Sequence, residues 1–141
     1  MAQTNTYKRA KKQAQPQIDT SLGHLPPQSV EVEKRVLGAL MIDVDAFTVV
    51  SELLRPETFY DPKHQKIFHA IQQLNIMEVP VDFVSVIEQL KKEGTHDEVG
   101  APTYIIELTD SVASSANIEY HARVLAQKYV ARQLISYAST I

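Results

Sequence analysis

The sequence has no cysteine, few glycines and no long apolar run, and each of these absences excludes a class of protein. Without cysteine there is no disulfide framework, no thiolate zinc site and no thiol nucleophile. None of the four glycines precedes a lysine, so the G-x-x-x-x-G-K-[ST] loop that cradles nucleotide phosphates is absent. The longest apolar run, residues 36–42, is too short to span a membrane, and no secretory signal opens the chain. We therefore expect a soluble, intracellular protein.

What is present is a hydrophobic content of 44% in 141 residues, enough for one domain with its own core. The charge is uneven: residues 1–24 carry a net charge of +3, whereas residues 25–141 hold 10 basic and 16 acidic groups, a net charge of −6. Residues 25–141, with this negative charge, are a poor electrostatic match for the phosphate backbone of a nucleic acid. The tail has almost no large apolar residue, so we expect it to be disordered. It is either a weak tether for nucleic acid or a partner, or a solvated extension.

Helix signals recur along residues 25–141, and no strand pattern lies between them. Asp61 before Pro62 is typical of a helix N-terminus, and Ile67, Ile71 and Leu74 then recur at helical spacing. The same start signals and apolar spacing predict six helices along the chain. The first covers residues 30–41, the second runs from Asp43 or Asp45 to before Pro56, and the third covers residues 62–76. The fourth runs from Asp82 to about Gly94, the fifth is a short helix from Pro102, and the sixth covers residues 118–141. The expected inward residues are Val32, Val36 and Leu40, then Phe47, Val50 and Leu54, then Phe83, Ile87 and Leu90, and then Ile105, Leu108 and Val112. The predicted fold class is all-α.

No catalytic constellation is visible. His64 and His69 are five residues apart on a predicted helix, so they miss the i, i+4 spacing of a metalloprotease, and we interpret both as ordinary surface or boundary histidines. The tyrosines are better explained as core or interface residues than as base-stacking residues, because no basic groove adjoins them.

The last predicted helix is about 35 Å long at 1.5 Å per residue, and its wide apolar stripe is still running at Ile141. This favours a polypeptide that continues beyond residue 141. The stripe is covered either by a second copy of the chain or by the bundle itself, and the pattern favours neither alternative.

The ordered set of motifs resembles the N-terminal domain of bacterial replicative helicases of the DnaB type. The motifs that carry the resemblance are Leu25-Pro26-Pro27-Gln28-Ser29-Val30-Glu31-Val32-Glu33, Val36-Leu37-Gly38-Ala39-Leu40-Met41, Phe59-Tyr60, His64, Ile67-Phe68, Pro80-Val81-Asp82, Val99-Gly100, Tyr104, Ser115-Ala116-Asn117-Ile118-Glu119-Tyr120 and Arg132-Gln133-Leu134-Ile135. The resemblance implies a compact helical head over residues 25–112. It also implies a linker turn and the first arm of a helical hairpin over residues 113–141.

The same resemblance implies a function in assembly and recruitment. Such helicases are hexamers, trimers of dimers, that unwind DNA with ATP and Mg²⁺ bound in a separate motor domain, so no cofactor or catalytic residue is expected here. The implied interface residues between copies are Leu125, Tyr129, Arg132 and Ile135, and the implied primase-binding residues are Glu31 and Tyr104. A helicase loader is a further expected partner, DNA contacts are expected through the motor domain, and the expected location is the bacterial cytoplasm at the nucleoid. The alternative is a stand-alone helical adaptor, such as a primase C-terminal helicase-binding domain or a loader module.

Overall fold

The computed structural model describes residues 25–140, and within them every regular element is helical. The elements are α2 (Val30–Ile42), α3 (Ala46–Val50), the 3-10 helix η2 (Pro56–Thr58), α4 (Pro62–Ile76), α5 (Phe83–Glu93), α6 (Thr103–Asp110) and α7 (Ile118–Thr140). The predicted all-α class is confirmed. The predicted tail, residues 1–24, lies outside the described residues.

Side-chain caps begin three of the helices, and two of them, Asp61 and Asp82, stand at predicted helix starts. The side chains of Ser29, Asp61 and Asp82 accept from backbone N–H groups in the first turns of α2, α4 and α5. Each such bond satisfies an N–H group that has no partner inside the helix. At the other end of α5, Gly94 has a φ of 75°, the left-handed conformation that a side chain disfavours. These local signals define the helix boundaries.

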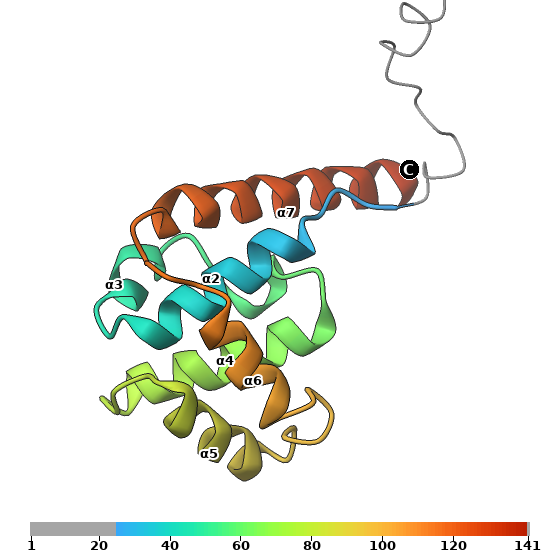
Figure 1. Cartoon of the computed structure of the whole chain (residues 1–141). Coiled ribbons are helices and arrows are strands. Elements are labelled where there is room, and N and C mark those ends of the chain that lie inside the picture. The colour runs from blue at the N-terminus through green and yellow to red at the C-terminus, as the bar shows by residue number, and fades with distance from the viewer. Residues whose placement is uncertain (1–24, 141) are drawn as a thin grey trace, which may run out of the picture.

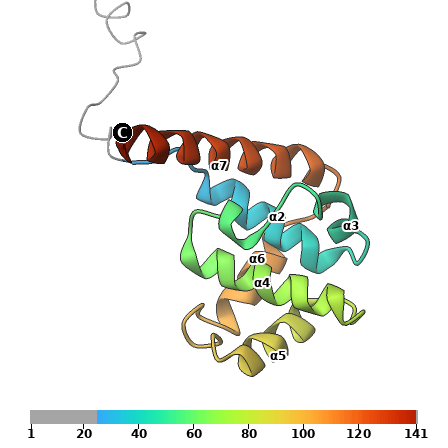
Figure 2. The ribbon, with the colours of Figure 1, turned by 180° about the vertical axis from the view of Figure 1, so that it is seen from behind.

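Helix α2 lies at the centre of the head, with α4 and α6 on one side and α7 across the other (Figures 1 and 2). It is buried continuously from Val36 to Met41. Gly38 allows the close approach of α6, because a Cβ atom there would overlap the carbonyl oxygen of Leu108 and the side chain of Val112. A side chain at position 38 would therefore separate these two helices.

Two predicted details are wrong. The second helix is much shorter than expected, since α3 covers only Ala46–Val50 and a turn follows it, although Phe47, Val50 and Leu54 are buried as predicted. On α5 the buried residues are Val86, Gln89 and Leu90, whereas Phe83 is 41% exposed. The face of α5 that meets the core is therefore rotated from the one that the apolar pattern predicted.

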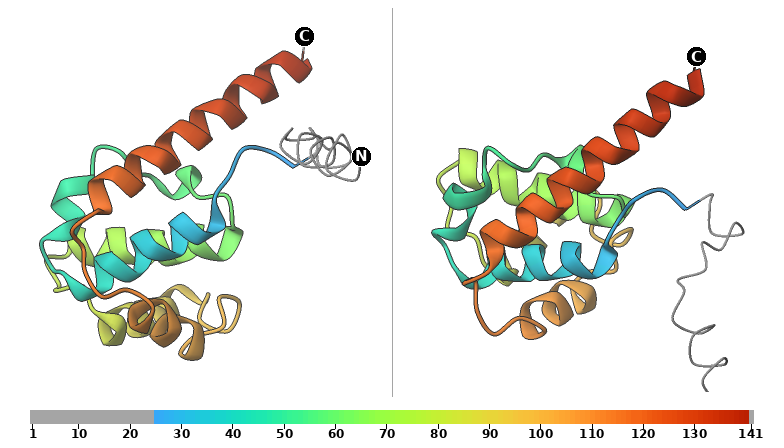
Figure 3. Two further views of the ribbon diagram at one scale, coloured as in Figure 1. Left: turned by 45° about the horizontal axis from the view of Figure 1, so that its top comes forward. Right: turned by 90° about the horizontal axis from the view of Figure 1, so that it is seen from above.

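Helix α7 packs on the head from its start as far as Arg132 (Figure 3). Ile118, Ala122 and Leu125 are buried in the core, whereas the side chains of residues 133–139 are exposed. The helix continues past the edge of the head, as Figure 3 shows from two directions. The N-terminal part of α7 therefore belongs to the core, and its C-terminal part is exposed.

Candidate partner-binding site

The site begins with a charged residue that has no exposed surface, Glu33 in the first turn of α2. Its carboxylate accepts hydrogen bonds from the backbone N–H groups of Tyr60, at 2.6 Å, and Asp61, at 3.3 Å. The Nδ1 atom of His64 lies 2.7 Å from Oε1. Because a carboxylate only accepts, Nδ1 carries the proton of this bond. Three donors thus compensate the burial of the charge and join α2 to the start of α4.

The other ring nitrogen of His64 extends this chain of hydrogen bonds toward the surface. Nε2 lies 2.6 Å from the hydroxyl oxygen of Tyr104 in α6. Burial, and then the negative charges of nearby carboxylates with Asp61 the largest, raise the pKa of Tyr104 to about 12. The hydroxyl therefore keeps its proton at neutral pH and donates to Nε2. The ammonium group of Lys63 lies 4.3 Å from the centre of the tyrosine ring. The chain from Glu33 to Tyr104 connects three helices.

The interpretation of His64 as a surface or boundary residue is wrong, because its side chain has no exposed surface. The side chain of His69 is 49% exposed and lies 3.1 Å from Glu93, as expected for a surface histidine. His64 precedes Ile67 and Phe68 by three and four residues, which places it on the core face of α4. That spacing is the sequence signal that could have identified the buried histidine.

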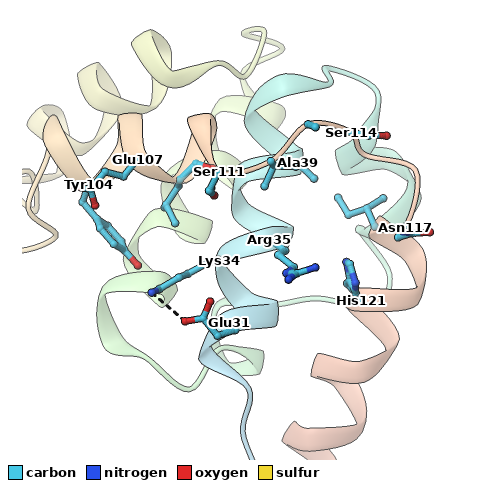
Figure 4. A pocket seen from close by; sticks show the side chains of 14 residues that line it. Glu31, Lys34, Arg35, Ala39, Tyr104, Glu107, Ser111, Ser114, Asn117 and His121 are labelled. Atoms are coloured by element: carbon cyan, nitrogen blue, oxygen red, sulfur yellow. Dashed lines mark hydrogen bonds and ion pairs between the residues drawn. The ribbon is translucent and has the colours of Figure 1, made fainter.

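Tyr104 is also part of a groove between α2, α6, the connection that follows α6 and the start of α7 (Figure 4). The groove has a volume of about 510 Å³. It brings together Glu31 and Tyr104, the two residues that the family resemblance assigned to primase binding. Its rim carries both signs of charge, from Glu31, Lys34, Arg35 and Glu107, and Lys34 pairs with Glu31 at 3.3 Å. Such a surface suits a polar partner with paired charges of its own.

The four residues implied for contact between copies do not share one environment. Leu125 is 1% exposed and belongs to the core of this chain. The ring of Tyr129 lies under the guanidinium groups of Arg55, at 5.9 Å, and Arg132, at 5.6 Å. Ile135 is 52% exposed. Of the four, Ile135 presents the apolar surface that another copy of the chain could cover.

Arg132 holds α7 against the head. Its two terminal nitrogens donate to the carbonyl oxygens of Pro27 and Thr58, both at 2.9 Å. The guanidinium also lies 5.6 Å from the centre of the Tyr60 ring. Planar bidentate donation of this kind is specific to arginine. The guanidinium therefore determines how the middle of α7 sits on the head, a role within the chain that the sequence did not indicate.

A family model described as the DnaB-like helicase N terminal domain matches residues 25–127. The chain belongs to this family. It is 46% identical over 112 residues to the replicative DNA helicase DnaB of Rhodothermus marinus, covering 79% of this chain and 12% of that protein. It is 44% identical over 117 residues to the replicative DNA helicase DnaB of Geobacillus stearothermophilus, covering 83% of this chain and 26% of that protein. The chain thus spans about a quarter of the length of one of these relatives and about an eighth of the other.

The fold is that of a solved DnaB domain. The crystal structure of the N-terminal domain of DnaB helicase from Mycobacterium tuberculosis matches with a TM-score of 0.79 and 35% identity, over 82% of this chain and 80% of that one. The resemblance inferred from the sequence motifs is confirmed. The family match contains Glu31, Glu33, His64 and Tyr104, and it ends inside α7 before Tyr129. The buried network and the groove therefore lie within the DnaB-like domain as the family model defines it.

Residues 25–140 contain no group of three or more His, Asp or Glu side chains placed to hold a metal ion. No helix in this part of the chain is long and apolar enough to cross a membrane.

Proposed function

We propose that this DnaB-like domain organises the ring of a hexameric replicative DNA helicase and recruits primase to it. The observation that supports this best is the groove, which brings Glu31 from α2 and Tyr104 from α6 onto one surface. These residues are far apart in the sequence, and the family resemblance assigned both to primase binding. In this proposal the groove faces primase, and the exposed C-terminal part of α7 pairs with a second copy.

The features of α7 support the assembly half of the proposal. Val130, Leu134 and Ile135 are 52–64% exposed on one helix that extends past the head. Apolar side chains in such an array are costly to leave in water, and a two-fold pairing of equivalent helices covers them on both chains at once. Trimers of such dimers form the ring.

The remaining activities belong to the rest of the full-length protein. We infer that ATP and Mg²⁺ bind in a motor domain, which also carries the DNA contacts for unwinding, and that a loader is a further partner of the ring. The net charge of −6 on residues 25–141 supports this division, because an acidic body is poorly suited to hold a phosphate backbone.

A calorimetric titration with the helicase-binding domain of primase from the same genome tests the docking half. We expect Glu31→Lys to weaken binding by about tenfold, because the substitution reverses a charge on the groove rim. The matched control is Glu119→Lys on α7, where an exposed glutamate also pairs with a basic residue of its own helix but lies outside the groove. Equal losses in the two variants, or no measurable binding by the unsubstituted chain, would contradict the proposal.

A further inference from the structure

Large apolar side chains are exposed at one end of the head, where the turn before α3 meets the loop from α4 to α5. This apolar end surface consists of Val44, Ile76, Met77, Val79, Phe83 and Val84, with exposed fractions between 39% and 67%. Figures 1 and 2 place α3 and the α4–α5 loop at the same end of the molecule, away from the C-terminal end of α7. The packing of α7 on the head therefore leaves this surface uncovered.

A hollow of about 460 Å³ shows that the two turns lie side by side. Its lining comes from Val44 and Asp45 in one turn and from Asn75, Glu78, Val79 and Pro80 in the other. The hollow shares no lining residue with the groove of Glu31 and Tyr104. A partner at the apolar end surface would therefore occupy a site separate from the one proposed for primase.

The charged side chains in the two segments that form the apolar end surface are all acidic. Residues 36–54 and 70–90, which form this end, contain no lysine, arginine or histidine. Asp43, Asp45, Glu78 and Asp82 adjoin these apolar residues in the sequence, and Asp45 and Glu78 also line the hollow. Within the described part of the chain, no ion pair joins any of the four to a basic side chain. The hydrogen bonds from Ser115 and from the backbone of Asp45 lower the pKa of Asp43, so this carboxyl stays charged at neutral pH.

Two helix C-termini add to the negative potential. Helix α2 ends at Ile42, next to Val44, and α4 ends at Ile76, within the surface itself. Neither helix has a basic residue in its last turn. The C-terminal end of a helix carries a partial negative charge that a nearby cation neutralises. The two helix ends therefore favour a positively charged partner, as the acidic side chains do.

We propose that the apolar end surface binds a cationic amphipathic helix of a partner protein. The apolar face of such a helix covers the exposed side chains, and its flanking lysines and arginines meet the carboxylates. Three other occupants are disfavoured by charge: a second copy would bring its own carboxylates, and nucleic acid and anionic lipid surfaces carry phosphates. This inference goes beyond ring assembly and primase docking, since it adds a second docking surface to the head.

The test uses the full chain labelled with ¹⁵N and a designed helical probe peptide of about 16 residues, with leucine on one face and lysine on the flanks. We expect amide shifts at residues 43–46 and 75–85 in the titration. The double variant Ile76→Ser/Val84→Ser should weaken binding by about tenfold or more, because both side chains are more than half exposed in the free protein and lose their apolar contact with the peptide. Glu78→Lys should weaken it severalfold and reduce its dependence on salt.

The control is Ile106→Ser, which removes an exposed apolar side chain from α6, outside both the apolar end surface and the face assigned to a second copy, and should leave peptide binding unchanged. Three results would overturn the proposal. One is equal binding of a peptide with glutamate flanks, and another is shifts confined to the groove of Glu31 and Tyr104. The third is binding of a peptide of residues 1–24 to the same surface as tightly as the probe, which would make the chain's own basic tail the occupant.

Discussion

Replacing Glu33 removes the common acceptor of three donors, the buried ring of His64 and two partly buried backbone N–H groups, and this substitution tests the network most directly. In Glu33→Ala the N–H groups of Tyr60 and Asp61 and the Nδ1 atom of His64 lose their common partner. Leaving such a donor without an acceptor costs about 1–3 kcal/mol, and we expect a total of about 3–5 kcal/mol because the two backbone N–H groups are only partly buried. A domain of this size has a free energy of unfolding of about 5–15 kcal/mol, so the loss is a large fraction of the total.

The variant Glu33→Gln removes the negative charge but keeps the size of the side chain, so it measures the contribution of the charge to stability. Glutamine retains one oxygen for Tyr60, but its amide group then faces the N–H group of Asp61, where a second acceptor is needed. We expect a loss of about 1.5–3 kcal/mol, the usual contribution of hydrogen bonds to a charged group. Urea unfolding followed by circular dichroism measures both variants, and with a slope of about 2 kcal/mol per molar the alanine midpoint falls by about 2 M.

Glu31 is a matched control for this experiment. It lies two residues earlier in the same helix turn, its side chain is 79% exposed, and it pairs only with Lys34. Glu31→Gln should change the free energy of unfolding by less than about 0.5 kcal/mol. If Glu33→Gln unfolds at the same urea concentration as Glu31→Gln, the buried carboxylate contributes nothing and the reasoning fails. A Glu33→Gln variant more stable than the parent would show that desolvation of the charge outweighs its hydrogen bonds.

Two further predictions concern Tyr104 and α7. Because burial raises the pKa of Tyr104 from 10.0 to about 12, the folded protein favours the protonated hydroxyl, and the stability it contributes is present below pH 10 and lost as the pH rises through about 12. Near-ultraviolet absorbance should show one tyrosine that ionises after the others and that disappears in Tyr104→Phe; a titration unchanged by this substitution would contradict the shift. The variant Leu134→Ser/Ile135→Ser should raise the dissociation constant of self-association about tenfold in sedimentation velocity, because it removes exposed apolar area from the face assigned to a second copy. Ile106→Ser, on α6, is the control, and a strictly monomeric parent chain at high concentration would contradict the assembly proposal.

Local signals in the sequence were sufficient for the helices but not for their rotation. Asp61, Asp82 and Gly94 act as predicted because a cap depends on the few residues around it. Which face of a helix is buried depends instead on the neighbouring helices. The apolar pattern of α5 therefore gave the wrong role to Phe83, while it missed the burial of Val86.

Glu31 and Glu33 show how far the sequence alone can identify the residues of the site. Both are acidic residues in the first turn of α2, where any acidic side chain interacts favourably with the helix dipole. Only Glu33 precedes Val36, Leu37 and Leu40 by three, four and seven residues, so only Glu33 lies on the buried face. A polar residue at that spacing indicates a buried position, but its partners lie in α4 and in the preceding loop. They can be identified only once the helices are packed.

The segment of residues 58–61 connects the buried network of Glu33 with the middle of α7, where Arg132 lies. This segment runs from the last residue of η2 to the residue before α4, where the chain forms no continuous helix, so its backbone groups need partners from elsewhere. The guanidinium of Arg132 supplies donors to the carbonyl oxygen of Thr58, and the carboxylate of Glu33 accepts from the N–H groups of Tyr60 and Asp61. One short segment is thus held by α7 on one side and by α2 on the other. The position of α7 on the head and the hydrogen bonds that end at Tyr104 in the groove therefore depend on the same four residues.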